Sequence, residues 1–165
     1  MGEDRSKREE LTPSRDAFMT HVDAVLDPAY RLASVLLADD TAAEEAVHRA
    51  TMRAWRGYRR VSGEVTNFRT WFLAIVVDQC RRERWLHPFR RRSSQRLVRP
   101  GGLPDAIRRL PAGTRAALFC FFFLDLPLDE VAHVLRVTPA RVRARVYRAG
   151  EQLQPLLDEN GSPAT

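Results

Sequence analysis

The sequence predicts an all-α protein of two small helical domains, an N-terminal helical bundle and a C-terminal helix-turn-helix, joined by a basic linker. Apolar residues recur at helical spacing in two separate blocks of the 165-residue chain. The segment between the blocks, FRRRSSQRLVRPGGL, is rich in arginine, serine, proline and glycine and has no apolar periodicity. We therefore expect a disordered leader at 1–14, a first domain at 15–88, a linker at 89–103, a second domain at 104–155 and a tail at 156–165.

The first domain is expected to begin with two helices and continue with a longer one. Helical periodicity starts at Phe18, and Asp27 followed by Pro28 is typical of the cap and first turn of a second helix. Thr41 and Glu44 then form a Thr-x-x-Glu capping box in front of the longer helix. That helix is expected to bury one apolar stripe, made of Ala43, Val47, Ala50, Ala54, Tyr58 and, at its edge, Trp55.

A further helix of the first domain is predicted after the segment VSGEVT, whose glycine and β-branched residues interrupt the helical pattern. Asn67 has a side chain suited to cap this helix, and Pro88 is expected to end it. Its apolar residues lead directly into an arginine-rich end, and they comprise Phe68, Trp71, Phe72, Ile75 and Val76.

The second domain is predicted to contain a short helix at 104–110, a longer apolar helix opened by Pro111, and a helix-turn-helix. Thr138 caps the last helix, Pro139 is its first residue, and Pro155 is expected to end it. One stripe of this helix is apolar and packs inward, through Val142, Val146, Ala149 and Leu153. Arginines flank the stripe on both sides, namely Arg141, Arg145 and Arg148 on one side and Arg143 on the other.

The formal net charge of +6 is concentrated in two segments. Residues 79–100 carry eight arginines and one glutamate, a net charge of +7, and residues 136–148 carry five arginines and no acid, a net charge of +5. Two basic segments on an otherwise acidic chain favour a polyanionic partner, usually nucleic acid. For either segment alone, a solvated arginine-rich face is the alternative, and for the last helix alone a membrane-surface or partner-binding helix has the same basic amphipathic pattern. The helix-turn-helix pattern favours DNA.

The sequence shows no signal for membrane insertion, secretion, metal binding or catalysis. The longest apolar run, at 116–124, is too short to cross a membrane, and the charged N-terminus is not that of a signal peptide, so we expect a cytoplasmic protein without membrane insertion. Cys80 and Cys120 are expected to be small buried residues. The histidines are too far apart for a zinc site, and no phosphate loop or catalytic set can be placed, although Asp78 and Cys80 would begin any catalytic hypothesis. We expect no metal, no cofactor and no enzymatic activity.

Three motifs resemble those of one protein family. The stretch LPLDEVAHVLRVTPARVRARVYRA at 126–149 is similar to the C-terminal DNA-binding region of extracytoplasmic-function sigma factors of the sigma-70 family. The stretch AEEAVHRATMRAW at 43–55 is similar to their core-polymerase-binding helix, and NFRTWFLAIVVDQCRR at 67–82 is similar to their promoter-melting helix. The motifs occur in the family's order and cover most of residues 16–153.

This resemblance implies a transcription initiation factor that binds core RNA polymerase, recognises the minus-thirty-five and minus-ten promoter elements and assists promoter melting. The implied partners are core RNA polymerase, promoter DNA and an anti-sigma factor. The positions that match the minus-thirty-five contact are Thr138, Pro139, Arg141, Arg143, Arg145 and Arg148. The positions that match the minus-ten contact are Asn67, Arg69, Trp71, Asp78, Arg81 and Arg82. The positions that match the polymerase contact are Glu44, Glu45, His48, Arg49, Met52 and Trp55.

Four residues depart from the family's pattern. His48 and Arg49 stand where the family usually has glutamine and glutamate, which reverses a charge on the expected polymerase-binding surface. Asp78 stands where asparagine is common, and Arg136 replaces the usual glycine of the helix-turn-helix turn. By resemblance, the loop at 61–67 would capture a base flipped out of the minus-ten element, and the linker would cross the polymerase cleft.

A stand-alone helix-turn-helix repressor is the alternative function. Such a repressor binds its operator unaided and usually as a symmetric dimer, whereas a sigma factor needs core polymerase. The motif at 67–82, which resembles a promoter-melting helix, favours the sigma factor.

Overall fold

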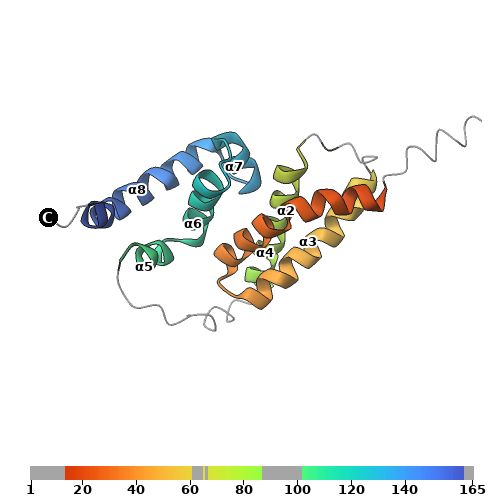
Figure 1. Cartoon of the computed structure of the whole chain (residues 1–165), viewed down its shortest axis with the longest axis horizontal. Helices are drawn as coiled ribbons and strands as arrows, with labels where there is room; N and C mark the ends of the chain where they lie inside the picture. The colour runs from red at the N-terminus through yellow and green to blue at the C-terminus, as the bar shows by residue number, and fades with distance from the viewer. Residues whose placement is uncertain (1–13, 61–64, 66, 87–101, 162–165) are drawn as a thin grey trace, which may run out of the picture.

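The structure, a computed structural model, describes residues 14–60, 65, 67–86 and 102–161, with side chains described as far as Leu156. The described residues form seven α-helices and one π-helical segment, and they include no strand, which confirms the all-α prediction. In chain order the elements are α2 (Arg15–Leu37), α3 (Asp40–Arg60), α4 (Phe68–Leu86), α5 (Gly102–Arg109), α6 (Ala112–Leu118), η2 (Phe119–Phe123), α7 (Leu128–Val134) and α8 (Pro139–Gly161) (Figure 1).

Helices α2, α3 and α4 form the bundle of the first domain around a cluster of aromatic side chains. The ring of Phe18 lies at the centre, 5.1 Å from the ring of Trp55, 5.3 Å from Tyr58 and 5.9 Å from Phe68. Aromatic pairs at such distances add about 0.5–1.5 kcal/mol to the gain from burial. The stripe predicted for α3 is buried, and its small side chains let the neighbouring helices approach closely; it comprises Ala43, Val47, Ala50, Ala54 and Tyr58.

The predicted helix break at Asp27 and Pro28 is wrong, because α2 is continuous and contains Pro28. A proline inside a helix removes one backbone donor and costs roughly 3 kcal/mol. The buried stripe of α2 nevertheless continues on both sides of the proline, through Val25, Ala29 and Leu32. Burial of this stripe against the bundle offsets the local cost, so the two predicted helices are one.

The start of α3 differs from the predicted capping box. Asp39 caps the helix, since its Oδ1 accepts the backbone N–H of Ala42 at 2.9 Å, and α3 begins one residue before Thr41. A carboxylate at this end accepts a free N–H and also interacts favourably with the helix dipole. The predicted cap of α4 is confirmed, because Asn67 Oδ1 accepts the backbone N–H of Thr70 at 3.1 Å.

Helices α5, α6, α7 and α8 and the segment η2 form the second domain, in which α7 and α8 are the predicted helix-turn-helix. Helix α5 corresponds to the predicted short helix but begins two residues earlier, at Gly102. The predicted longer helix divides into α6 and the π-helical η2, where the N–H of Leu124 donates to the carbonyl of Phe119 at 3.0 Å. The wider π turn coincides with the run FCFFF, in which the rings of Phe119 and Phe123 stack at 4.8 Å.

Helix α8 starts as predicted but ends later. Pro139 is its first residue, and the Oγ1 of Thr138 accepts the N–H of Arg141 at 3.3 Å. The prediction that Pro155 ends the helix is wrong, because α8 continues to Gly161. Pro155 lies on the exposed side of the helix, where water can satisfy the carbonyl that loses its partner.

Three predictions fall wholly or mostly on residues outside the described part of the chain. Of the expected leader at 1–14, only Ser14 is described, and its side chain accepts the N–H of Asp16 at the start of α2. Of the expected linker at 89–103, only the last two residues are described, and they begin α5. The loop expected to capture a base, at 61–67, also lies outside except for Val65 and Asn67.

Helix α4 lies between the first-domain bundle and the second domain. Its residues from Phe72 to Val77 are all buried, because α2 and α3 cover one side of the helix and α7 covers the other (Figure 1). A helix that is hydrophobic on every side is typical of such a position. One apolar cluster therefore extends from Phe18 in the bundle to Val142 in α8, and the two domains are packed directly against each other.

Candidate nucleic-acid and polymerase interfaces

Six residues match the family's minus-ten contact, and three of them do not face the second domain. Asn67 caps α4, and Arg82 is exposed. Trp71 packs on α3, where its Cζ2 lies 3.1 Å from the place that a Cβ on Gly57 would occupy, and its ring centroid lies 5.5 Å from that of Phe68. Trp71 is thus a packing residue whose outer edge remains partly exposed.

The other minus-ten positions contact the second domain. The Nη2 of Arg69 donates to the backbone carbonyl of Leu124 at 2.9 Å, and the Nη2 of Arg81 donates to the carbonyl of Leu135. These carbonyls belong to the C-cap residues that directly follow η2 and α7. The guanidinium groups that the resemblance assigns to DNA are therefore bound to protein in this arrangement.

The acidic minus-ten position, Asp78, contacts Arg136, so two of the departures from the family pattern meet. The Nη2 of Arg136 lies 3.4 Å from the Oδ2 of Asp78. Arg136 has a φ of 50°, in the left-handed region that glycine adopts without strain and other residues adopt at a cost. The chain keeps an arginine at this position, and its side chain reaches the first domain.

Helix α8 presents most of its arginines to solvent. Arg141, Arg143 and Arg148 are exposed, whereas Val142 and Ala149 are buried. This separation of the two faces confirms the predicted inward stripe. A helix with a basic outer face and a capped first turn has the shape required to enter a major groove.

Arg145 differs from the other arginines of α8, because it is partly buried against α6. Its Nη1 donates to the carbonyl of Gly113 at 3.3 Å, and a Cβ on Gly113 would lie 3.1 Å from the same nitrogen. Burial, and after it the positive charges of Arg141 and Arg81, lower the pKa of Arg145. Arg81 belongs to α4, so basic residues assigned to two different promoter elements lie near each other.

Three of the six positions that match the family's polymerase contact form an exposed row along α3. Glu44, His48 and Met52 are spaced by four residues and all are exposed. Trp55 turns inward and packs on Phe18, with 5.1 Å between the ring centroids. An exposed methionine flanked by polar side chains gives this helix face an apolar centre, which is suited to contact with another protein.

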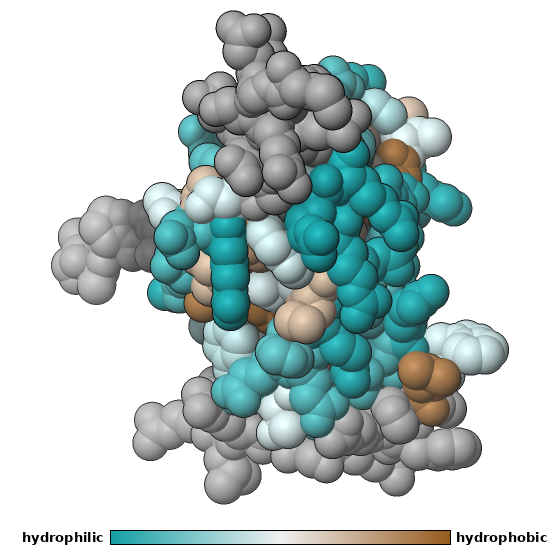
Figure 2. Space-filling view, turned by 90° about the vertical axis from the view of Figure 1, so that its right-hand side faces the viewer, coloured by the Kyte–Doolittle hydropathy of each residue, from teal (hydrophilic) through white to brown (hydrophobic). Residues whose placement is uncertain are grey.

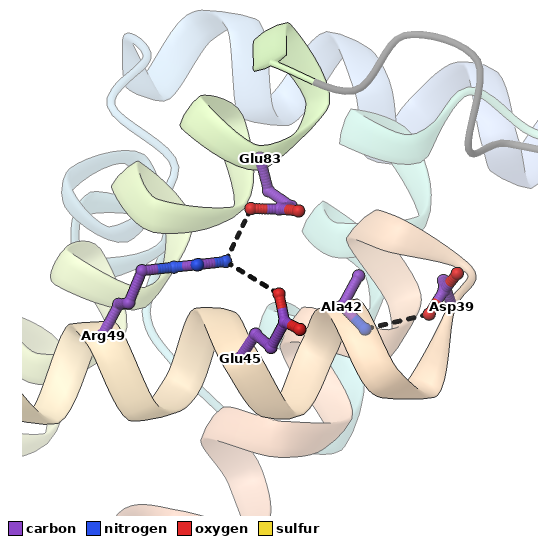
Figure 3. A network of polar contacts seen from close by, with 5 residues as sticks. All are labelled: Asp39, Ala42, Glu45, Arg49 and Glu83. Atoms are coloured by element: carbon purple, nitrogen blue, oxygen red, sulfur yellow. Dashed lines mark hydrogen bonds and ion pairs between the residues drawn. The ribbon is translucent and has the colours of Figure 1, made fainter.

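Arg49 lies beside this row and connects α3 to α4. Its Nη2 is 3.3 Å from a carboxylate oxygen of Glu45 and 2.6 Å from one of Glu83 (Figure 3). Glu83 is only 5% exposed, and a carboxylate so deeply buried needs a charged or hydrogen-bonding partner. The arginine that reverses the family's usual charge therefore neutralises an acid of the same domain.

Two exposed phenylalanines at the end of η2 were not singled out by the sequence analysis. Phe122 is 69% exposed and Phe123 is 57% exposed, and the guanidinium carbon of Arg31 lies 5.4 Å from the ring centroid of Phe123. The run FCFFF places apolar side chains on several sides of a helix, which is a sequence signal that some of them would be exposed. By contrast, the first-domain end of the molecule is mostly hydrophilic and has only small separate apolar patches (Figure 2).

Neither a metal centre nor a membrane span is found among the residues that the structure describes. No group of three or more His, Cys, Asp and Glu side chains there could hold a metal ion, and no helix there is long and apolar enough to cross a membrane. Cys80 and Cys120 are buried, as predicted, and burial raises the pKa of each thiol to about 12.

Comparison with known proteins identifies the family. A family model described as sigma-70 region 2 matches residues 21–94, and one described as sigma-70, region 4 matches residues 102–153. The chain belongs to the sigma-70 family. It is a transcription initiation factor with the pairing of regions 2 and 4 that is typical of the extracytoplasmic-function type. Because region 2 accounts for the first domain, a stand-alone repressor is not favoured.

A solved structure has a similar fold. It is the sigma factor RpoE from Bartonella quintana, crystallised in complex with the anti-sigma factor NepR. The TM-score is 0.66 at 22% sequence identity, and the alignment covers 86% of this chain and 97% of that chain. Because 86% of this chain is aligned, the similarity includes both of its domains. No curated protein sequence matches the chain.

Proposed function

We propose that the second domain of this sigma factor recognises the minus-thirty-five element with the outer face of α8. One observation carries the proposal: Arg141, Arg143 and Arg148 are exposed on a helix whose opposite face, with Val142 and Ala149, is buried. A helix presented in this way fits the major groove, where arginine makes bidentate contacts to guanine or binds phosphate. The same surface of α8 would therefore contact the bases and bind the phosphate backbone of the DNA.

The first turn of α8 and Arg145 would make secondary contacts. Thr138 and Pro139 precede a set of backbone N–H groups at the helix N-terminus, which favours phosphate. Arg145 is bound to the carbonyl of Gly113 and would reach DNA only after it leaves that partner. Its contribution to DNA affinity is therefore smaller than that of the exposed arginines.

The first domain would recognise the minus-ten element and assist melting through α4. Extraction of a base from the duplex costs a few kcal/mol, which cations and aromatic stacking on the single strand can offset. A carboxylate repels phosphate but accepts hydrogen bonds from the amino groups of cytosine or adenine, so Asp78 would alter base preference relative to asparagine. The residues in this role are Asn67, Arg69, Trp71, Asp78, Arg81 and Arg82.

Core RNA polymerase would bind the exposed row of α3, made of Glu44, His48 and Met52. Glu45 and Arg49 border this row, and Trp55 supports it from the core. The exposed pair Phe122 and Phe123 would provide a second polymerase contact on the other domain, because adjacent exposed aromatic side chains typically mark a protein-binding site.

An anti-sigma factor is the further partner that we propose. The similar protein RpoE was crystallised with an anti-sigma factor, and the exposed apolar groups of this chain offer a surface that such a partner could mask. The sigma factor would act in the cytoplasm, where core polymerase transcribes, and would itself catalyse no reaction.

Run-off transcription on genomic fragments, with purified core polymerase, tests this function. Discrete transcripts are expected only when both the polymerase and the sigma factor are present. Arg143→Ala should weaken upstream protection in a footprint of the holoenzyme, while Arg108→Ala, which removes an exposed arginine of α5, should leave the footprint unchanged. Binding of a palindromic site by the chain alone, without any association with core polymerase, would instead support the repressor.

A further inference from the structure

The last turn of α4 carries an exposed tryptophan. Trp85 is 81% exposed, more than any other large apolar side chain of the described residues. The other two tryptophans of the chain pack on phenylalanine rings, with 5.1 Å between the centroids of Trp55 and Phe18 and 5.5 Å between those of Trp71 and Phe68. An indole left in water forgoes the gain from burial, so its position favours a partner outside this chain.

Positive charge surrounds Trp85 and favours a polyanionic partner. The charged residues exposed in the last two turns of α4 are three arginines, Arg81, Arg82 and Arg84. The acid among them, Glu83, is buried and pairs with Arg49, so this end of α4 keeps a net positive charge. Proteins bind single-stranded nucleic acid with this combination, in which cations hold the phosphates and an aromatic ring stacks on a base.

Trp85 lies in line with Asp78, the minus-ten position whose carboxylate can accept hydrogen bonds from bases. Seven residues separate the two, which is nearly two full turns, so both side chains leave the same side of α4 about 10 Å apart along its axis. Arg81, between them, donates to the carbonyl of Leu135, whereas Trp85 is one turn farther along and exposed. Stacked bases of one strand are about 3.4 Å apart, so a strand at Asp78 places another base at Trp85 within about three nucleotides.

We propose that Trp85 is a stacking site for an unpaired base of the opened minus-ten region. This inference rests on the proposed role of α4 in minus-ten binding, and it adds a residue outside the positions that the resemblance provides. In a duplex the flat faces of the bases are covered by their neighbours, so an indole finds a free face only where the strand has opened. A base held on Trp85 cannot rejoin the duplex stack, and the opened strand is stabilised.

Stacking on Trp85 and hydrogen bonding to Asp78 make different contributions to promoter binding. Every base has a flat face, so the indole accepts any of the four and adds affinity without a base preference. The carboxylate of Asp78 accepts only from amino groups and therefore contributes to the choice of base. Base identity should matter little at the nucleotide that reaches Trp85, whereas the presence of a base there should matter.

Abasic nucleotides test the site in the holoenzyme, on a promoter obtained by run-off transcription. They are placed one at a time in each strand of a minus-ten region whose strands are left unpaired, and the affinity of the holoenzyme is measured. At one position the missing base should lower the affinity of the parent protein about tenfold. Trp85→Leu should lose about tenfold with the intact strand and nothing further at that position. Losses that add at every position would overturn the proposal, because the indole and the base would then act independently.

Conservative variants separate stacking from mere apolar bulk. Trp85→Phe keeps an aromatic face and should bind the unpaired strand within about threefold of the parent protein, whereas Trp85→Leu keeps an apolar side chain and should lose about tenfold. Leu86→Ser is the matched control, because Leu86 is the next residue, is 59% exposed and has no aromatic face. It should retain the parent affinity. Equal affinities for Trp85→Phe and Trp85→Leu, or an equal loss in Leu86→Ser, would reject a stacking site.

Salt dependence distinguishes the indole from the arginines around it. A fluorescent single-stranded oligothymidine is titrated with the free chain over a range of salt concentrations. Trp85→Leu should lower the affinity about tenfold at every concentration, because stacking releases no counterions. Arg84→Ala should instead reduce the slope of log affinity against log salt by about 0.7. A loss in Trp85→Leu that disappears at high salt would mean that the variant disturbs the arginines, and stacking would be rejected.

Failure of this site and failure of the proposed function give different results. A lack of run-off transcripts from the parent holoenzyme rejects the proposed function, and the oligothymidine titration still tests the site. Normal transcription, with Trp85→Leu opening the promoter as readily as the parent protein, rejects the stacking site alone. Weaker binding of Trp85→Leu to core polymerase in the absence of DNA would assign the indole to a protein interface and overturn the proposal.

Discussion

Arg49 of α3 and Glu83 of α4 form an ion pair in which the Nη2 of the arginine lies 2.6 Å from the carboxylate oxygen (Figure 3). The arginine is about half exposed and the glutamate is almost completely buried. The pair explains why an arginine that departs from the family's pattern can stand on α3, because Glu83 of the same domain neutralises its charge. It also joins the helix proposed to bind polymerase to the helix proposed to melt DNA.

Arg49→Ala is expected to lower the free energy of unfolding by about 2 kcal/mol. The substitution removes a charged hydrogen bond from a buried carboxylate, although the exposed half of the pair is already screened by water. Chemical denaturation of the two proteins at pH 7, followed by circular dichroism, measures the difference.

Glu83→Gln in the Arg49→Ala background is the control for this assignment. A neutral amide costs less to bury than a carboxylate, so the double variant should be more stable than Arg49→Ala alone. If Arg49→Ala unfolded like the parent protein but bound core polymerase more weakly, the arginine would be a polymerase contact rather than a partner of Glu83.

The two kinds of arginine on α8 should respond differently to alanine substitution. Arg143→Ala is expected to leave stability unchanged, to weaken minus-thirty-five binding and to reduce the slope of log affinity against log salt by about 1. Arg145→Ala should instead destabilise the domain by about 1 kcal/mol, because the carbonyl of Gly113 loses its donor. Thermal melts and fluorescence anisotropy on duplex DNA separate the two effects, and identical profiles for both variants would contradict them.

Local sequence patterns correctly predicted a helix where its apolar spacing and its capping residue both indicate the same element. The apolar stripe of α3 and the caps provided by Asn67 and Thr138 follow from spacing and residue type alone. The rule that proline breaks a helix failed at Pro28 and Pro155. At Pro28 the burial of a continuous stripe outweighs the lost hydrogen bond, and at Pro155 solvent replaces it.

The pairing of charged residues could not be predicted from the sequence. Arg49 and Glu83 are 34 positions apart, and Asp78 and Arg136 are 58 positions apart, so no periodic pattern relates them. The resemblance identified three of these residues as departures but provided no partner for them. Their partners depend on how α4 packs against α3 and against α7, which is a property of the tertiary structure.

The two cysteines should be inert toward thiol reagents in the folded protein. Burial raises the pKa of Cys80 and Cys120 to about 12, so at pH 8 both remain thiols, and only the thiolate reacts. A disulfide reagent added at pH 8 should give no rapid reaction with the native chain and two equivalents after denaturation. Rapid modification of one equivalent without denaturant would contradict the burial.

The same shifts predict lower stability in alkali. The thiol pKa is 9.0 in an unfolded chain and about 12 in the folded protein, so both states hold the proton below pH 9 and the stability is fully present there. Between pH 9 and 12 only the unfolded chain releases its protons, so the free energy of unfolding must fall. Denaturation series from pH 8 to 11 should show this fall, and it should be smaller in Cys80→Ala and Cys120→Ala. An equal decline in these variants would assign the effect to other groups.

Substitution of the exposed phenylalanines should weaken binding to core polymerase without harm to the fold. Phe122 and Phe123 are mostly exposed, so Phe122→Ser with Phe123→Ser removes little buried area and should change the free energy of unfolding by less than about 1 kcal/mol. The same pair would be buried in a complex, where loss of two aromatic contacts typically costs 10-fold or more in affinity, equivalent to about 1.4 kcal/mol. Trp85→Ser, which removes an exposed aromatic residue from the end of α4, is the matched control and should retain the parent affinity. Surface plasmon resonance with immobilised core polymerase distinguishes the two variants, and equal affinities would remove the phenylalanine pair from the polymerase interface.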